Sequence, residues 1–243
     1  MRKYKYENTE ELIAIDLISK SNSNKIQLSI SVINIDFRQI EDNIEEIIKA
    51  WYENKNLNSS VDLIIEKFLN PKLSRENDFL NSCFAIETFH RRIKKIEVYE
   101  KSEFKKIRKS ILDNIGNDEI KKFIDEKLSF ANEPTFRARL FDLKTHFEYI
   151  LPSNVDIGDY IGKIVKTRNF LVHRGDSNNT FDNFDMFYAA RYIESIVRIC
   201  VLIELKVPED IILKIQNCNK THLRDMYNMN KKRKTSVLNK NHM

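Results

Sequence analysis

The chain has 243 residues, of which 42% are hydrophobic and 32% charged, a balance typical of a folded protein with a buried core. It contains only four glycines and four prolines. Rossmann sheets, P-loop enzymes and many-stranded sandwiches need glycine for turns and phosphate loops, so the composition disfavours them and favours long helices.

The sequence predicts a cytoplasmic protein that does not enter a membrane. The three cysteines show no Cys-x-x-Cys spacing, which is typical of reduced thiols: Cys83, Cys200 and Cys218. The first ten residues are polar and do not resemble a secretory signal. The most apolar run, residues 196–205, is too short to span a bilayer and is interrupted by Arg198 and Glu204.

The net charge of +5 is concentrated at the C-terminus. From Lys214 onward there are eight basic residues and one acid, so the first 213 residues carry a net charge of −2. We predict that residues 218–243 form a basic, disordered tail. As an alternative, the basic run at residues 231–234 could contact phosphate groups.

The first predicted element is a strand. Apolar and polar residues alternate over 26–35, within an N-terminal extension of residues 1–38. Because a single strand needs a partner, the extension has room for one or two strands. The segment 12–18 is a candidate for the second strand, although it also fits a helix.

The remaining predicted elements are helices, because apolar residues recur at helical spacing between the prolines. Ser59 or Ser60 is expected to cap the second helix, and Gly175 to follow the end of the seventh. The predicted helices cover 37–54, 59–70, 74–95, 102–114, 117–130, the stretch between Pro134 and Pro152, 155–174, 182–206 and 208–216. The fold class is therefore all-α, with a helical domain over residues 39–217.

One helix carries polar residues that suggest chemistry. Arg168 continues the apolar stripe of Ile157, Ile161, Ile164 and Leu171, where a core residue is expected. A buried guanidinium is costly unless it is paired, so Arg168 needs a carboxylate, a phosphate or a water-filled cleft. Glu87 similarly interrupts the stripe of Leu80 and Phe84 on the 74–95 helix. We therefore predict an ion pair between Glu87 and Arg168.

Asn169 and His173 are four residues apart and can meet the same ligand, whereas Arg168 and His173 are about 140° apart on an ideal helix. Gly158 and Gly162 are also four apart and would let another helix approach closely.

The segment Lys166-Thr167-Arg168-Asn169-Phe170-Leu171-Val172-His173 resembles the Arg-x4–6-His signature of HEPN domains. The upstream segment 79–92, with Glu87, His90, Arg91 and Arg92, resembles the Glu-aromatic-His-Arg helix of the ApeA-like branch, which the Trp51 helix also fits. The resemblance covers roughly residues 40–206. Longer ApeA-like proteins carry a β-rich domain ahead of the HEPN bundle, so the resemblance implies that residues 1–38 are a remnant of such a domain.

The resemblance implies a metal-independent endoribonuclease with catalytic residues Arg168, Asn169 and His173, supported by Glu87. The 2′-hydroxyl would attack the adjacent phosphorus and leave a 2′,3′-cyclic phosphate, with imidazole as base or acid and Arg168 facing the phosphorane oxygens. HEPN nucleases commonly dimerise, so we expect a homodimer whose two motifs share one cleft. His90, Arg91, Arg92 and Arg174 would contact RNA, or else form a solvated basic patch.

Two other functions fit the same residues. The chain would be an inactive HEPN domain that serves in interaction or RNA binding, or the toxin of a toxin–antitoxin pair. The resemblance implies a role in anti-phage defence by abortive infection, with a phage trigger or an antitoxin as partner. No cofactor is expected. Cys218 and His222 are four residues apart, but a metal centre would need further ligands and is not predicted.

Overall fold

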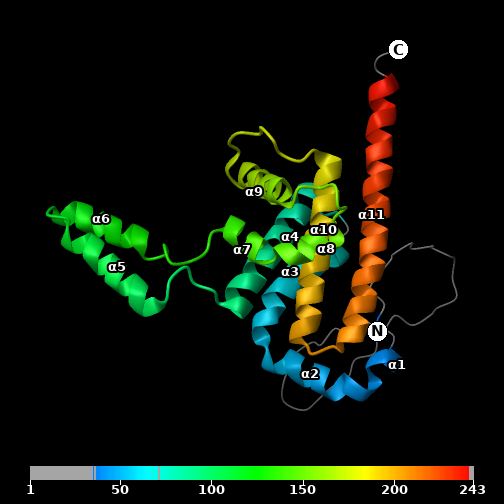
Figure 1. The fold of residues 1–243 in the computed structure, drawn as a ribbon, viewed down its shortest axis with the longest axis horizontal. Helices are drawn as coiled ribbons and strands as arrows, with labels where there is room; N and C mark the ends of the chain where they lie inside the picture. Colours follow the sequence, from blue (N-terminus) through cyan, green and yellow to red (C-terminus); the bar gives the residue numbers. More distant parts are fainter. Residues whose placement is uncertain (1–34, 36, 71, 241–243) are drawn as a thin grey trace. The chain divides into compact units, whose positions relative to one another are not determined.

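We describe a computed structural model of the chain, which covers residues 35, 37–70 and 72–240 (Figure 1). The described residues form helices and no strand, so the all-α prediction is confirmed. The predicted strand at 26–35 and most of the extension of residues 1–38 lie outside the described residues. Within the described part of the chain, no helix has the length and apolar character needed to cross a membrane.

The first helices follow the predicted boundaries closely. α1 (Phe37–Ile40) and α2 (Ile44–Glu53) are joined by a 3₁₀ turn, and α3 covers Asn58–Leu69. Ser59 and Ser60 both lie inside α3 and neither caps it, because the N-cap residue is Leu57 and no side chain caps the helix; the predicted cap was therefore wrong. α4 begins after Ser74, whose hydroxyl accepts a hydrogen bond from the backbone N–H of Asn77, and covers Arg75–Phe89.

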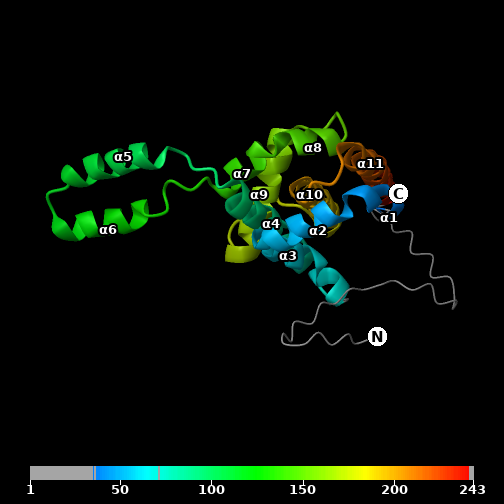
Figure 2. The ribbon, with the colours of Figure 1, turned by 90° about the horizontal axis from the view of Figure 1, so that it is seen from below.

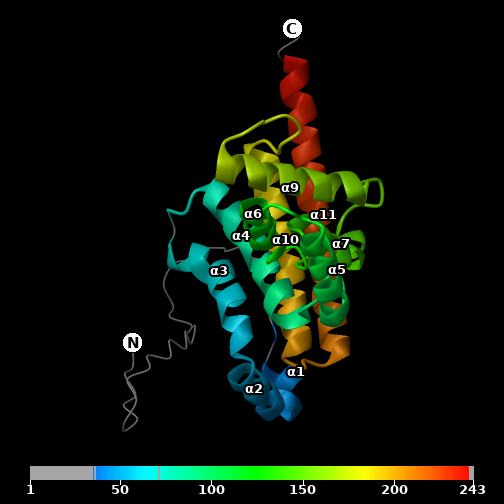
Figure 3. The same cartoon turned by 90° about the vertical axis from the view of Figure 1, so that its left-hand side faces the viewer.

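α4 and α10 (Asn183–Glu204) form the centre of the bundle, where they lie against each other (Figures 1 and 3). Both helices contribute fully buried apolar side chains to one core cluster, among them Phe79, Ile86, Phe89, Tyr192, Ile193 and Ile196. α3 packs on the other side of α4, and α11 (Glu209–Lys240) packs along α10. The core thus holds α4 rigidly from two sides.

The stretch between Pro134 and Pro152 forms two helices rather than the single predicted one. α7 (Phe136–Asp142) and α8 (Lys144–Ile150) meet at Leu143, which is buried. The break lets α7 pack on α9 (Ile157–His173) while α8 packs on α10 and α11. No glycine or proline marks Leu143, so the sequence pattern had no breaker at this position.

The last helix is longer than predicted. α11 continues to Lys240, although the sequence placed its end near Gln216 (Figure 1). No glycine or proline follows Pro208, so nothing in the sequence forces an end to the helix. Residues 218–240 of the predicted disordered tail are therefore helical, with Leu223 buried against the core.

α5 (Lys101–Asp113) and α6 (Asp118–Leu128) form a hairpin (Figure 2). Neither of the two helices has a buried residue. Arg108 and Asp125 join the two helices by an ion pair of 2.6 Å. At the base of the hairpin the backbone N–H of Val98 donates to the carbonyl of Asn132 at 3.0 Å. The side chain of Asn132 also accepts from the N–H of Tyr99 and donates to its carbonyl.

Candidate active site

α9 provides the frame for the Arg168 motif. Asp156 caps its start by accepting a hydrogen bond from the N–H of Asp159. Ile161, Ile164 and Leu171 are buried on its inner face, while Asn169 and His173 are exposed. Arg168 lies between these faces with 21% of its side chain exposed. The sequence pattern placed Arg168 at a core position, and the structure shows it largely buried but partly exposed.

The guanidinium of Arg168 is held on several sides. Nη2 donates to Glu87 Oε2 at 3.4 Å, which is the predicted ion pair, and Nη1 donates to Asn169 Oδ1 at 3.2 Å. The rings of Phe84 and Phe136 lie 5.8 and 5.6 Å from the guanidinium carbon, within the range of cation–π attraction. Its Nε is buried and has no hydrogen-bond partner among the described residues. The guanidinium is thus held in one orientation, while its Nε–H remains without an acceptor among the described residues.

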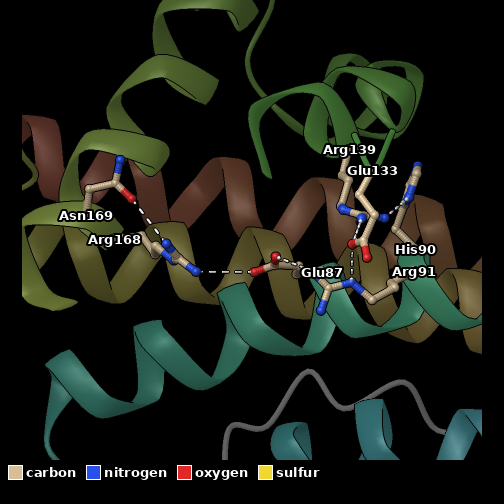
Figure 4. Close-up of polar contacts among 7 residues, drawn as sticks. All are labelled: Glu87, His90, Arg91, Glu133, Arg139, Arg168 and Asn169. Atoms are coloured by element: carbon tan, nitrogen blue, oxygen red, sulfur yellow. Dashed lines mark hydrogen bonds and ion pairs between the residues drawn. The ribbon is translucent and has the colours of Figure 1, made fainter. Parts of the chain in front are cut away.

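Glu87 belongs to a longer series of ion pairs (Figure 4). Its second oxygen, Oε1, accepts from Arg91 Nη2 at 3.4 Å. Arg91 Nε forms an ion pair with Glu133 Oε2 at 3.1 Å, and Arg139 Nη2 donates to the same oxygen at 3.1 Å. Cations and anions therefore alternate from α9 across α4 to α7. Glu133 and Arg139 were not among the predicted site residues.

His90 does not fit the predicted role in RNA binding, because its side chain is only 1% exposed. Nδ1 lies 3.2 Å from Arg139 Nη1, and Nε2 lies 3.1 Å from Asp142 Oδ2. Because a guanidinium can only donate, Nδ1 accepts and the ring proton is on Nε2, which donates to Asp142. Burial lowers the pKa of His90, and the neighbouring Arg139 and Lys94 add to this effect, while Asp142 opposes it. His90 is therefore a neutral, structural histidine that joins α4 to α7.

The other predicted RNA contacts are exposed but are not gathered at Arg168. Arg91 pairs with Glu87 and Glu133, and Arg92 Nη1 donates to Ser59 Oγ on α3 at 3.0 Å. Arg174 Nη2 lies 3.8 Å from Glu76 Oε2 at the start of α4. Within the described part of the chain, the imidazole of His173 forms no hydrogen bond. The structure therefore joins Arg168, Asn169 and Glu87 directly, and leaves His173 free on the exposed face of the same helix.

The end of α9 differs from the prediction in one respect. The left-handed residue is Arg174, with φ of 53°, and not Gly175; the N–H of Arg174 donates to the carbonyl of Phe170 at 2.7 Å. The loop that follows is anchored by buried Thr167. Its hydroxyl donates to the carbonyl of Lys163 at 2.8 Å and accepts from the N–H of Phe181 at 2.9 Å.

The two glycines of α9 face α7 of the same chain. A Cβ added to Gly162 would lie 3.4 Å from Arg137 Nη1. One added to Gly158 would lie 3.2 Å from Oδ1 of the capping Asp156 and 4.0 Å from Phe141 Cζ. Both distances to α7 are ordinary van der Waals contacts, so the packing of α9 on α7 does not require glycine at these positions. The helix that approaches them is α7 of the same chain, so they do not in themselves indicate a contact with a second copy.

Lys166, which was not among the predicted site residues, is exposed three residues before Asn169 and seven before His173. At helical spacing these three side chains share a face, and this spacing was visible in the sequence. Among the described residues no group of three or more His, Cys, Asp or Glu side chains is placed to hold a metal ion.

Comparison with known proteins identifies the family of the chain. No curated protein and no solved structure matches the chain. A family model described as Apea-like HEPN matches residues 80–211, from within α4 through α10 to the start of α11. This match covers more than half of the chain and includes Glu87, Arg168 and His173. The chain therefore belongs to the ApeA-like HEPN family.

Proposed function

We propose that the protein is a metal-independent endoribonuclease whose active site is formed by Arg168, Asn169 and His173. The observation that carries the proposal is the arrangement at the end of α9. A half-buried guanidinium is fixed by Glu87 and two aromatic rings, and the next turns of the helix present Asn169 and His173 to solvent.

These residue types suit RNA cleavage. A base takes the proton of the 2′-hydroxyl while the O2′–P bond forms; the P–O5′ bond breaks and an acid returns a proton to O5′. The products are a 2′,3′-cyclic phosphate and a 5′-hydroxyl. Imidazole can serve as base or acid near neutral pH, and Arg168 supplies forked donors to the phosphorane oxygens. Asn169 accepts from Arg168 through Oδ1, which leaves its NH₂ group to donate to a phosphate oxygen.

A second copy of the chain would complete the site. Four histidines lie among the described residues, and His173 is the exposed one; His90 is buried, and His146 and His222 are partly buried. One imidazole cannot be base and acid in the same step, so two copies that face one cleft would supply both groups. If light scattering shows that the species that cuts RNA is a monomer, this shared site is wrong.

The test is RNA cleavage by purified protein in excess EDTA, with wild type, Arg168→Ala and His173→Ala compared side by side. His222→Ala is the matched control, because it removes an imidazole from α11 without touching the motif. We expect cyclic-phosphate ends from wild type and His222→Ala, and a loss of at least about 100-fold in the two motif variants, as is common for catalytic groups.

Each other outcome has a separate meaning. Cleavage that disappears in EDTA would contradict metal-independent chemistry. A folded wild-type protein that cuts no RNA would favour an interaction or RNA-binding module, or a toxin silenced by a partner that is absent from the assay. Equal cleavage by wild type and His173→Ala would exclude His173 from the reaction.

The biological role we propose is anti-phage defence by abortive infection, in the cytoplasm, with a phage trigger or an antitoxin as the controlling partner. Membership of the ApeA-like HEPN family supports this role. Expression of wild type should slow growth or block phage propagation, and His173→Ala should do neither.

A further inference from the structure

We infer that Glu133 is a positioning residue for Arg168, acting through Arg91 and Glu87. The inference rests on the proposed function, in which Arg168 faces the reacting phosphate. Glu133 lies outside the Arg-x4-His motif, in the loop between the α5–α6 hairpin and α7.

The carboxylates of Glu87 and Glu133 each pair with two arginines. Glu87 pairs with Arg168 through Oε2 and with Arg91 through Oε1, both at 3.4 Å. Glu133 Oε2 pairs with Arg91 and Arg139, both at 3.1 Å. Arg91 is thus shared between the two acids (Figure 4). The position of Arg91 decides how strongly the Glu87 carboxylate can pair with Arg168.

The charges explain why Glu133 is needed. Arg139 is buried, and the positive charge of Arg91 lowers the pKa of Arg139 further after the effect of burial. Without Glu133 these two cations would repel each other, and Arg91 would retain only Glu87 as its anion. Arg91 would then move toward Glu87 and compete with Arg168 for it. Among the described residues Glu87 is the acid paired with Arg168, so Arg168 would lose its fixed direction.

The backbone holds Glu133 in place. Its N–H donates to the carbonyl of Phe130 at 3.1 Å, and the adjacent Asn132 closes the base of the hairpin against residues 97–99. The base of the hairpin therefore influences the orientation of Arg168 through the side chains of Glu133, Arg91 and Glu87. A preorganised cation contributes mainly to the transition state, so the expected effect is on kcat.

The test compares Glu133→Gln with Glu148→Gln. Both glutamates are about half exposed, at 45% and 47%, and both form ion pairs, but Glu148 pairs with Lys144 on α8. In EDTA we expect kcat of Glu133→Gln to fall by about tenfold while KM for RNA stays within about twofold, and Glu148→Gln to match wild type. Glu133→Asp, which keeps the charge, should recover part of the loss. Arg91→Gln should lower kcat similarly, and the double variant should lose no more than either single variant.

A second measurement does not depend on catalysis. The Nε–Hε signal of Arg168 in a ¹⁵N NMR spectrum, assigned by its loss in Arg168→Lys, should shift or broaden in Glu133→Gln but not in Glu148→Gln. If the signal moves while wild type cuts no RNA, the positioning stands and the proposed function fails. If kcat and the signal are both unchanged in folded Glu133→Gln, the inference is wrong. Should Glu133→Gln fail to fold, Arg91→Gln replaces it, because Arg91 is 55% exposed.

Discussion

At the scale of single residues, largely buried charged side chains form ion pairs that join several helices of this protein. Besides the ion pairs at Arg168, a second cluster joins α3, α4 and α10. Glu194 is buried on α10 and contacts Lys67, Arg191 and Arg198, while Arg191 also contacts Asp78 on α4. Burial raises the pKa of Glu194, against the effect of Arg191 and Arg198. The two acids therefore stay in the core only because cations from neighbouring turns surround them.

The pH dependence of stability should report on Asp78. Burial, and then the charge of Glu194, raise its pKa from 3.8 to about 6 in the native state. The native state therefore binds more protons than the unfolded state in this window, and the free energy of unfolding falls as pH rises through it. The side chain of Asn in Asp78→Asn cannot titrate. We therefore expect the difference in free energy of unfolding, variant minus wild type, to be about 2 kcal/mol larger at about pH 7 than at about pH 4. Urea unfolding followed by circular dichroism at several pH values measures this difference.

Asp113→Asn, at the exposed end of α5, is the matched control and should follow the wild-type pH profile. If Asp78→Asn also runs parallel to wild type, then the contact with Arg191 keeps Asp78 charged in the folded protein, and the predicted direction is wrong.

At the scale of elements, the helices and their order could be predicted because apolar spacing and the prolines are local signals. The Glu87–Arg168 pair could be predicted because two charges interrupted two apolar stripes. Glu133 and Arg139 could not, since their contacts join segments that only the tertiary fold brings together. His90 lies in the predicted helix, but residues 90–94 form a π-turn that rotates the chain after Phe89. A regular α-helical pattern therefore could not predict the directions in which the side chains of His90, Arg91 and Arg92 point.

The loop after the motif should depend on a single side chain of α9. In Thr167→Val the buried N–H of Phe181 loses its acceptor, and a buried donor left without a partner costs about 1–3 kcal/mol. We expect lower stability of this size and faster hydrogen exchange at the Phe181 amide. Thr180→Val is the matched control, because its hydroxyl donates only to a local turn carbonyl, that of Ser177. Equal exchange rates in the two variants would mean that core packing, and not Thr167, holds the loop.

At the scale of the whole molecule, the question is where the folded domain ends. The sequence placed its boundary at residue 217, and the family match ends at residue 211. The structure shows contacts to the core beyond both positions. Asn219 Nδ2 donates to Ser195 Oγ at 3.0 Å, and the hydroxyl of buried Tyr192 donates to the carbonyl of Leu223 at 3.1 Å. α11 therefore supports α10 at least as far as Leu223.

Shortening the chain should locate this end. A chain that stops after Asp225 keeps these contacts and should unfold close to the temperature of the full chain. A chain that stops after Gln216 loses the burial of Leu223 and the hydrogen bond from Tyr192 to the Leu223 carbonyl, which together should cost about 3–5 kcal/mol. Thermal unfolding of both chains measures the difference.

Leu223→Ala in the full chain should lower the free energy of unfolding by about 2–4 kcal/mol. Leu213→Ala, at a position of the same helix that is 45% exposed, should lower it by under about 1 kcal/mol. If the chain ending at Gln216 is as stable as the full chain, the predicted boundary at 217 is correct and the contacts of Asn219 and Leu223 add little to the fold.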